Sequence, residues 1–383
     1  MIQLVANTID AFDIDALCNW LKVSNKLTKG PITELFEKEW SNFIGVKYST
    51  FVNSGSSANL LMLSVLIELG ILKKEDYVVV PAVCWATDFS PVVSLNLNPL
   101  ICDCNLEDLS IDIDHLKDLI KWDKSKVLLL VSVLGLVPNL DEIIKVCEDN
   151  DMILLCDDCE SLGSQYKGRK LGNFGLMSSF SLYFGHHLNT IEGGMICTND
   201  ENLNDVLKSM RSHGWDRDLS SDKQKQLREK HSIDEFDALY TFYNLGYNMR
   251  STDLQAFIGR RQLVKAHNIV NIRNENFFHY HDSLNSGIWK PKIYEDRYIS
   301  NFAYPIIHEN RKEIVKNLKK EDIEARPLIA GNITRHPVYS KYGDPISLKN
   351  ADKVHDFGMY LPNHHELTKE QILHICDIVN SSI

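Results

Sequence analysis

The sequence has no excess of positive charge, no long apolar run and no regular cysteine framework. Its 383 residues include 41 Lys and Arg against 52 Asp and Glu, which gives a formal net charge of −11. Nucleic-acid-binding proteins usually carry a basic surface, so this balance argues against a nucleic acid as the partner. No stretch approaches the roughly 18 consecutive apolar residues of a membrane span, and the first residues lack the layout of a secretory signal. We expect a cytoplasmic protein with no membrane segment.

The nine cysteines are odd in number and scattered, and most stand in apolar runs. This pattern is typical of buried free thiols and not of a disulfide framework. Two pairs have a spacing that could begin a metal site, Cys102 with Cys104 and Cys156 with Cys159. Neither has a second Cys or His pair at zinc-finger spacing, so we expect no metal.

Apolar segments of strand length alternate with helical segments in the first half of the chain. Strands are predicted at residues 77–81, 99–104, 126–134 and 152–157, and helices at 33–43, 58–72, 111–121 and 139–149. Continuous apolar strands that are each followed by a helix predict a parallel or mostly parallel sheet with both faces covered. Such sheets bind ligands at the carboxyl ends of their strands.

The second half has a different character. The polar, lysine-rich stretch 218–236 predicts an exposed loop or mobile excursion. A long helix is expected from about residue 251 to 284, long enough to bridge two domains, and the remainder predicts a smaller α+β unit. We therefore divide the chain into a large cofactor-binding domain, 1–250, and a linking helix with a small C-terminal domain, 251–383.

The segment 53–59, NSGSSAN, stands immediately before a predicted helix. The backbone N–H groups of Gly55 and Ser56 would lie at the positive end of that helix, where a phosphate binds favourably. An ordinary helix cap has a similar sequence, so the motif alone does not decide between the two.

Four further residues could complete a ligand site. Asp157 ends the strand 152–157, and a carboxylate in such apolar surroundings suits a cation such as a protonated pyridine nitrogen; a helix cap is the alternative. Trp85 follows the strand 77–81, and its indole could cover a planar ring or pack in the core. Ser181 and Asn248 could add polar contacts to a phosphate. Each of these residues also has an ordinary structural explanation.

The order of these motifs resembles the sugar-modifying branch of the fold type I pyridoxal phosphate enzymes, the DegT/DnrJ/EryC1/StrS aminotransferase family. The likeness rests on NSGSSAN, VPAVCW, CDDCESLGSQYKGRKLGNFG, FSLYFGHHLNTIEGGM and GYNMRSTDLQAFIG, which together cover nearly the whole chain. It implies an aspartate aminotransferase-like α/β fold, with a large mostly parallel-sheet domain and a smaller C-terminal α+β domain. It also implies pyridoxal 5′-phosphate or pyridoxamine 5′-phosphate as the cofactor.

By position, the resemblance gives each candidate a role. Asp157 resembles the carboxylate that pairs with the pyridine nitrogen, and Trp85 resembles the aromatic residue that stacks on the ring. Gly55, Ser56 and Ser181 match the phosphate-binding residues. Asn248 matches an asparagine that reaches the phosphate of the neighbouring subunit, which implies a homodimer with shared active sites.

The family pattern has a lysine in the turn before Gly-Glu-Gly-Gly, where this chain has His186. The lysine holds the cofactor as an imine and also moves a proton, whereas a histidine can move a proton but cannot form that imine. The resemblance therefore implies a cofactor held without a covalent bond and used in its amine form. A subset of the family, the nucleotide-sugar 3-dehydratases, has this histidine.

This subset implies the reaction. It removes the C3 hydroxyl of a nucleotide-linked 4-keto-6-deoxysugar, here GDP-4-keto-6-deoxymannose or a related GDP-sugar, to give a 3,6-dideoxy-4-ketosugar. Glutamate is the expected amino donor. His213 and Arg326 are candidate contacts to the sugar or the diphosphate, because an arginine fork suits phosphate, although either could be a surface residue. His187 should point away from its neighbour and have a packing or supporting role.

Three alternatives remain at this stage. The chain could be an aminotransferase in which a lysine from elsewhere reaches the C4′ carbon of the cofactor. It could instead be a non-catalytic paralogue that only binds nucleotide sugars. It could also hold a metal between the two adjacent histidines and Cys156 and Cys159. The cofactor-site motifs favour dehydration over all three.

Overall fold

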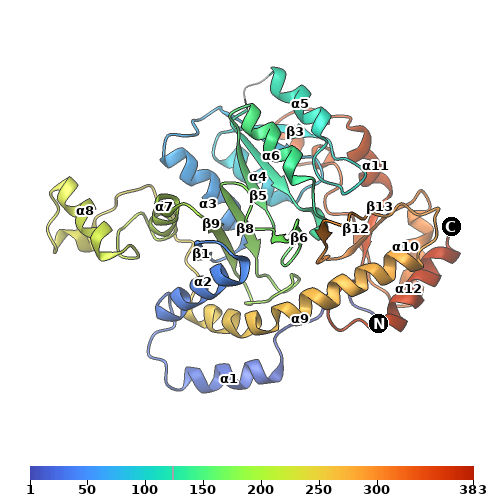
Figure 1. Ribbon diagram of the computed structural model, residues 1–383, viewed down its shortest axis with the longest axis horizontal. Helices are drawn as coiled ribbons and strands as arrows, with labels where there is room; N and C mark the ends of the chain where they lie inside the picture. The colour runs from blue at the N-terminus through green and yellow to red at the C-terminus, as the bar shows by residue number, and fades with distance from the viewer. Residues whose placement is uncertain (123–124) are drawn as a thin grey trace.

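A computed structural model of the protein describes residues 1–122 and 125–383. Its centre is a seven-stranded sheet in the order β1-β9-β8-β5-β4-β2-β3 (Figure 1). The strands are β1 (Tyr48–Val52), β2 (Tyr77–Pro81), β3 (Asn98–Cys102), β4 (Val127–Val131), β5 (Ile153–Asp157), β8 (Met177–Ser181) and β9 (Gly194–Thr198). The strands from β8 to β3 pair in parallel, and β9 is antiparallel to both of its neighbours. The prediction of a mostly parallel sheet is confirmed.

Each predicted strand is present, and two of them, β3 and β4, end earlier than expected. β4 ends at Val131, because the chain then enters a short 3₁₀ helix, Val133–Gly135. Leu134 within this turn has a φ of 51°, a left-handed conformation that is uncommon for a leucine. The run 126–134 did not reveal this turn, because residues 127–134 are all buried whether they lie in the strand or after it.

Helices cover both faces of the sheet. They are α2 (Pro31–Ile44), α3 (Gly55–Glu68), α4 (Ala86–Ser94), α5 (Ile113–Trp122), α6 (Leu140–Asp149) and α7 (Glu201–Arg211). The first helix, α1 (Ala11–Leu21), instead packs on the outer side of the long helix Asp253–Ser283 (Figure 1). Adjacent residues of β9 face two different apolar clusters. Ile196 belongs to the cluster that contains most of α3, while Met195 and Cys197 belong to the cluster formed by α2 and the start of α9. The sheet is thus buried on both sides, as a fold of this class requires.

The C-terminal part contains its own small sheet, β11-β13-β12. Its elements are α9 (Asp253–Ser283), β10 (Arg297–Tyr298), β11 (Tyr304–Ile307), α10 (Arg311–Lys320), β12 (Arg326–Pro327), α11 (Lys349–Phe357), β13 (Gly358–Leu361) and α12 (Lys369–Ser381). A further small sheet joins β10 to β6 (Gln165–Tyr166) and β7 (Arg169–Lys170). Ile2 forms a bridge with Ile323, so the first residues of the chain also contact this part. The domain division at residues 250 and 251 stays a prediction.

The lysine-rich stretch 218–236 contains a helix, α8 (Ser221–His231), where the sequence predicted a loop. The apolar periodicity that signals a buried helix face is absent, because none of the residues of α8 is buried. Capping and charge stabilise the helix instead. Ser220 caps its first turn, and Arg228 near its end forms an ion pair of 2.8 Å with Asp216. Figure 1 shows α8 projecting away from the central sheet.

Within the described residues, no helix combines the length and the apolar character that crossing a membrane requires.

Candidate active site

The candidate site lies at the carboxyl ends of β4, β5 and β8, three neighbouring strands of the central sheet. Asp157 is the last residue of β5, Ser181 is the last residue of β8, and His186 follows Ser181 by five residues. The first turn of α3 faces these strand ends. Parallel strands bring their carboxyl ends to the same edge, which is why motifs far apart in the sequence meet here.

The segment 53–59 forms the first turn of α3 and does not simply precede it. The helix begins at Gly55, three residues earlier than predicted, because the Ser54 hydroxyl caps it by accepting from the Ser57 N–H at 3.1 Å. The N–H groups of Gly55 and Ser56 belong to the first turn, where helical N–H groups have no partner within the helix. They are therefore available to an anion at the positive end of the helix.

Close packing at this turn requires glycine at two positions. A Cβ on Gly55 would lie 2.8 Å from the Cβ of Ser181 and 3.0 Å from the Sγ of Cys159. A Cβ on Gly194, the second glycine of the Glu192-Gly-Gly motif, would lie 2.2 Å from the carbonyl oxygen of Ser54. The first turn of α3, the end of β8 and the start of β9 thus form one compact unit.

Asp157 lies in a buried network of neutral donors. Its Oδ2 accepts from the Asn59 amide at 2.5 Å, and its Oδ1 accepts from the Cys159 N–H at 2.9 Å. The Asn59 amide group also donates to Asp88 at 3.2 Å, while the Asn59 carbonyl accepts from the Ser179 hydroxyl at 2.6 Å. These contacts fix the Asp157 carboxylate at the end of β5.

Asp88 is a second buried carboxyl beside Asp157, and the motifs did not predict it. Its Oδ2 caps α4 by accepting from the Trp85 N–H at 3.1 Å. Burial, followed by the adjacent charge of Asp157, raises the pKa of Asp88 well above its ordinary value. The hydrogen-bond donors to this pair within the described residues are neutral. The site therefore has a surplus of negative charge that suits a cationic ring.

The imidazole of His186 lies in the same site. Its ring centroid is 5.2 Å from that of Phe302 and 6.4 Å from that of Tyr183. Burial lowers the pKa of His186 to about 4, although the nearby Asp157 carboxylate acts in the opposite direction. At neutral pH the ring is uncharged and can accept a proton. Its Nδ1 is buried and has no hydrogen-bond partner within the described residues.

His187 points elsewhere, as the sequence predicted. It is 1% exposed, and its Nε2 lies 3.0 Å from the carbonyl oxygen of Ser300. Ser300 in turn accepts at its backbone carbonyl from Ser164 and donates its N–H to the same hydroxyl at 2.8 Å. His187 therefore anchors the turn that contains His186 to the segment 300–302.

That segment is also held from the other side by buried Arg273 of α9. The guanidinium donates to the carbonyl oxygen of Phe302 at 2.8 Å and to that of Asn363. Phe302 itself donates its N–H to the Leu134 carbonyl at 2.8 Å. The backbone of Phe302, whose ring contacts His186, is thus held by the turn after β4 and by α9.

Glu160, three residues after Asp157, is a further carboxyl that the motifs did not predict. Its Oε2 accepts from the N–H of Leu134 at 2.7 Å, and its side chain is half-buried. Burial raises the pKa of Glu160 to about 8; the bond from Leu134 lowers it, and Asp157 raises it. Glu160 also acts on the pKa of Tyr360 in β13, which places these two side chains near each other.

Trp85 caps α4 at the end of β2, and its side chain is 58% exposed. The core-packing alternative is therefore wrong, and the indole is free to cover a ring that binds at Asp157. Ser181 is half-buried at the end of β8, in contact distance of the Gly55 position.

The structure places Asn248 beside the segment 53–59 of its own chain, with an exposed side chain. Met249 accepts from the N–H of Asn53 at 2.9 Å, while the Asn248 Oδ1 accepts from Arg250 at 3.1 Å. Arg250 also lies 3.3 Å from the Nε2 of His213. Asn248, Arg250 and His213 therefore form one polar cluster near this turn.

Arg326 lies in the C-terminal sheet, where β12 pairs with β13 and places it opposite Tyr360. Its side chain is 51% exposed and lies 3.7 Å from Glu324. Tyr360 contacts Phe302, with ring centroids 6.4 Å apart. Arg326 is thus connected to His186 through two aromatic residues: Tyr360, its partner in the sheet, and Phe302, which contacts both Tyr360 and His186.

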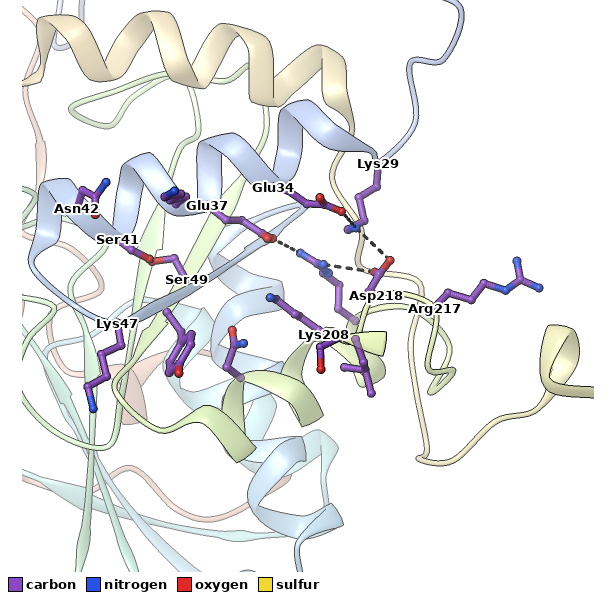
Figure 2. A pocket seen from close by; sticks show the side chains of 16 residues that line it. Lys29, Glu34, Glu37, Ser41, Asn42, Lys47, Ser49, Lys208, Arg217 and Asp218 are labelled. Atoms are coloured by element: carbon purple, nitrogen blue, oxygen red, sulfur yellow. Dashed lines mark hydrogen bonds and ion pairs between the residues drawn. The ribbon is translucent and has the colours of Figure 1, made fainter. Parts of the chain in front are cut away.

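A cavity of about 580 Å³ lies elsewhere, between α2, the start of β1 and α7 (Figure 2). None of its lining residues belongs to the predicted site. Buried Arg211 at its floor is neutralised by Glu37 at 2.5 Å and Asp218 at 3.4 Å. Figure 2 shows Lys47 and Arg217 pointing away from this acidic pair. These two side chains therefore do not converge on Arg211.

The metal alternative has no geometric support. Within the residues that the structure describes, no three His, Cys, Asp or Glu side chains are grouped as metal ligands. His186 and His187 point to different partners, and all nine cysteines are free thiols.

The profile of the DegT/DnrJ/EryC1/StrS aminotransferase family matches residues 8–380. The chain belongs to this family. The GDP-4-keto-6-deoxy-D-mannose 3-dehydratase of Yersinia pseudotuberculosis is 33% identical over 386 aligned positions, which cover 98% of this chain and 97% of the relative. The solved structure of the Escherichia coli GDP-4-keto-6-deoxy-D-mannose 3-dehydratase with bound hydrated PLP has a TM-score of 0.90, 30% identity and 99% coverage of both chains.

A further solved structure of a GDP-4-keto-6-deoxymannose 3-dehydratase contains a trapped PLP-glutamate geminal diamine. It has a TM-score of 0.90 and 30% identity, and the match covers 99% of this chain and all of that one. The fold is therefore that of the fold type I enzymes, as the sequence predicted. The described residues fit a flat cationic ring with a phosphate: an acidic pair for the ring, a free helix terminus for the phosphate and an exposed indole beside them.

Proposed function

We propose that this protein is a pyridoxamine 5′-phosphate-dependent nucleotide-sugar 3-dehydratase. It removes the C3 hydroxyl of GDP-4-keto-6-deoxymannose, or of a related GDP-linked 4-keto-6-deoxysugar, and yields a 3,6-dideoxy-4-ketosugar. Glutamate restores the amine of the cofactor after each turnover. The proposed substrate is the one in the names of the relatives, and the PLP-glutamate adduct in a similar solved structure supports glutamate as the amino donor. Such a reaction fits the cytoplasm and the synthesis of a polysaccharide.

One observation carries this proposal. The turn before Gly193 and Gly194 presents the imidazole of His186 to the site. Ordinary transamination would need an amine at this position to hold the cofactor covalently. The imidazole is kept uncharged by burial, so it can take a proton but cannot form an imine.

When bound, pyridoxamine phosphate supplies an amine that condenses with the C4 ketone and a protonated ring that accepts electrons. Asp157 holds the ring nitrogen's proton, and Asn59 keeps that carboxylate in place. The N–H groups of Gly55 and Ser56 and the hydroxyl of Ser181 hold the phosphate, and Trp85 covers one face of the ring. His186 takes the proton from the C4′ carbon.

The remaining predicted residues contact the substrate or the second subunit. Arg326 and His213 bind the sugar or the diphosphate, which the exposed guanidinium of Arg326 suits. Asn248 reaches the phosphate of the neighbouring subunit, and its exposed side chain is consistent with this role. We therefore propose a homodimer with two shared sites.

Replacement of His186 tests the reaction. H186N keeps the size and part of the hydrogen bonding of the ring but is not a base near neutral pH. Loss of water from GDP-4-keto-6-deoxymannose, with glutamate present, should fall by about 10²- to 10⁴-fold, as for a lost general base. Ammonia release and product mass measure this, and binding of pyridoxamine phosphate should survive.

H186K provides the contrasting variant. It should restore an imine that borohydride fixes to the protein, whereas the parent should show none. A parent enzyme that delivers the 4-amino sugar, or an H186N variant that deoxygenates at the parental rate, would contradict the proposal.

A further inference from the structure

The orientation of the His186 imidazole is not fixed by a hydrogen bond at Nδ1. In many active sites the second nitrogen of the base donates to a carboxylate or a carbonyl, which fixes both the tautomer and the ring. Here the Nδ1 of His186 is buried and has no hydrogen-bond partner within the described residues. Side-chain packing therefore has to hold this imidazole in place.

Phe302 supplies most of this packing. Its ring centroid lies 5.2 Å from that of His186, with an angle of 47° between the two planes. The same ring contacts His187 at 6.5 Å and Tyr360 at 6.4 Å. Tyr183 also contacts His186, but its ring is 6.4 Å away and the residue is 50% exposed. Phe302 is half-buried and is the nearer of these two aromatic neighbours.

The backbone holds Phe302 in a fixed position. Its N–H donates to the carbonyl of Leu134 at 2.8 Å, and its carbonyl accepts from Arg273 at 2.8 Å. Two residues earlier, the carbonyl of Ser300 lies 3.0 Å from the Nε2 of His187. These contacts join the segment to the turn after β4, to α9 and to the turn of the two histidines. The ring is thus presented to His186 from a backbone that is bonded on each side.

Arg273 holds this segment with a buried charge. It is 2% exposed, and its guanidinium donates to the backbone carbonyls of Asn301, Phe302 and Asn363. Burial without a carboxylate partner disfavours the cation, and it lowers the pKa of Arg273 to about 9. The same positive charge contributes to the low pKa of His186. Arg273 therefore acts on the base both through the backbone of Phe302 and through its charge.

Resting on the proposed function, we propose that Phe302 is the positioning residue of the base His186. Its ring holds the imidazole in one orientation and excludes water from the face that it covers. Phe302 exchanges no proton itself. Its removal should therefore leave a base in the site, but one that is less well oriented and more easily protonated.

The surroundings of His186 determine how its pKa responds. The titratable residues that face it are Asp157 on β5, Cys159 after β5, Arg273 on α9, and Tyr183 and His187 on its own turn. Burial is the largest cause of its pKa of about 4. Without the ring of Phe302, water reaches the imidazole, so the pKa should rise toward the ordinary value of about 6.5.

The F302A variant tests both effects through the dependence of turnover on pH. At about pH 8 His186 is neutral in parent and variant, so a loss of about tenfold in dehydration of the GDP-4-ketosugar reports orientation alone. At about pH 5 the loss should be about ten times larger, because a pKa near 6 leaves only about a tenth of the imidazole unprotonated. Binding of pyridoxamine phosphate should stay within a few-fold of the parent.

A second readout needs neither cofactor nor substrate. In protein with isotope-labelled histidine rings, the magnetic resonance signal that H186N lacks belongs to His186. Its titration midpoint should lie at about 4 in the parent and be higher by about one to two pH units in F302A. F302L keeps a branched apolar side chain and should give an intermediate midpoint. A parent that deoxygenates nothing would refute the proposed function, but it would not alter this titration.

F278A is the matched control. Phe278 lies on α9, is 37% exposed, and has its ring 5.4 Å from that of Phe277. F278A should change neither the titration of His186 nor the pH dependence of turnover, and thermal unfolding of both variants measures any general destabilisation. A parental titration midpoint together with a parental pH dependence in F302A would overturn the positioning role. The same changes in F278A as in F302A would overturn it as well.

Discussion

At the scale of single residues, Asp88 and Asp157 show how one side-chain type takes two roles. The two carboxyls share the amide of Asn59, yet they have different second partners. Asp88 caps α4, and burial together with Asp157 favours its neutral form. Asp157 instead accepts from the Cys159 N–H at the end of β5, where we propose that it faces the cofactor ring. Replacement by a neutral amide should therefore be tolerated at Asp88 and not at Asp157.

We expect D157N to bind pyridoxamine phosphate poorly and to lose most turnover, because an amide does not hold the ring proton. D88N should keep cofactor affinity and turnover within a few-fold, since its amide oxygen can still accept from the Trp85 N–H and its amide hydrogens can face Asp157. Absorbance titration and product assays measure both. Equal losses in the two variants would show that Asp88 carries a functional charge.

Several of the residues that the sequence predicted end strands or begin helices. Asp157 follows an apolar run, and Gly55 lies in a Gly-Ser turn, so their positions could be derived from local pattern. Asn59 and Asp88 could not, because their bonds join segments 98 and 29 residues apart. The sequence does contain one signal for Asp88, its spacing of three residues from Trp85, which is the spacing of a capping box.

At the scale of elements, α3 combines a helix terminus with a close contact. Its first residue must be glycine because of Ser181 and Cys159, not because of its own backbone angles. G55A should weaken binding of pyridoxamine phosphate by about tenfold or more, which corresponds to about 1.4 kcal/mol. The added methyl group must displace the end of β8 or the helix terminus that binds the phosphate.

G287A is the control for this variant, because a Cβ there has a single neighbour, Ile383, at 3.9 Å. Titration of each variant with the cofactor, together with thermal unfolding, separates a local change from general destabilisation. If G55A bound the cofactor as tightly as the parent, the first turn of α3 would not be the phosphate site.

The apolar pattern of the sequence predicts the central strands but not α8 or the start of α3. The strands of the central sheet were found because they are buried on both faces and therefore uniformly apolar. α8 was missed because a helix without a buried face has no apolar period, and only its cap and its ion pair indicate it. The early start of α3 was missed because the small residues of its first turn contribute nothing to periodicity.

At the scale of the whole molecule, the shared active site of the proposed homodimer can be tested by mixing inactive variants. N248A and H186N should each have little activity. Refolded together at equal amounts, they should regain about a quarter of the parental turnover, because half of the dimers are mixed and each contains one intact site of two.

The outcome of mixing depends on whether Asn248 binds the phosphate of the neighbouring subunit or that of its own subunit. If it binds the phosphate of its own chain, as its place beside the Asn53 turn also permits, no mixed dimer contains an intact site. Mixing would then restore no activity. Sedimentation of the parent at assay concentrations, which should show a dimer, is the accompanying measurement.

The projecting helix α8 has a consequence for how assembly can be observed. None of its side chains is buried within its own chain, so its backbone amides are shielded from water only by the helix itself. In an isolated subunit they should exchange their hydrogens for deuterium at the rate of a fraying helix, while the amides of β4 and β5 exchange slowly. Any slowing of exchange in α8 on raising the protein concentration would be a direct signal of a second subunit lying against it.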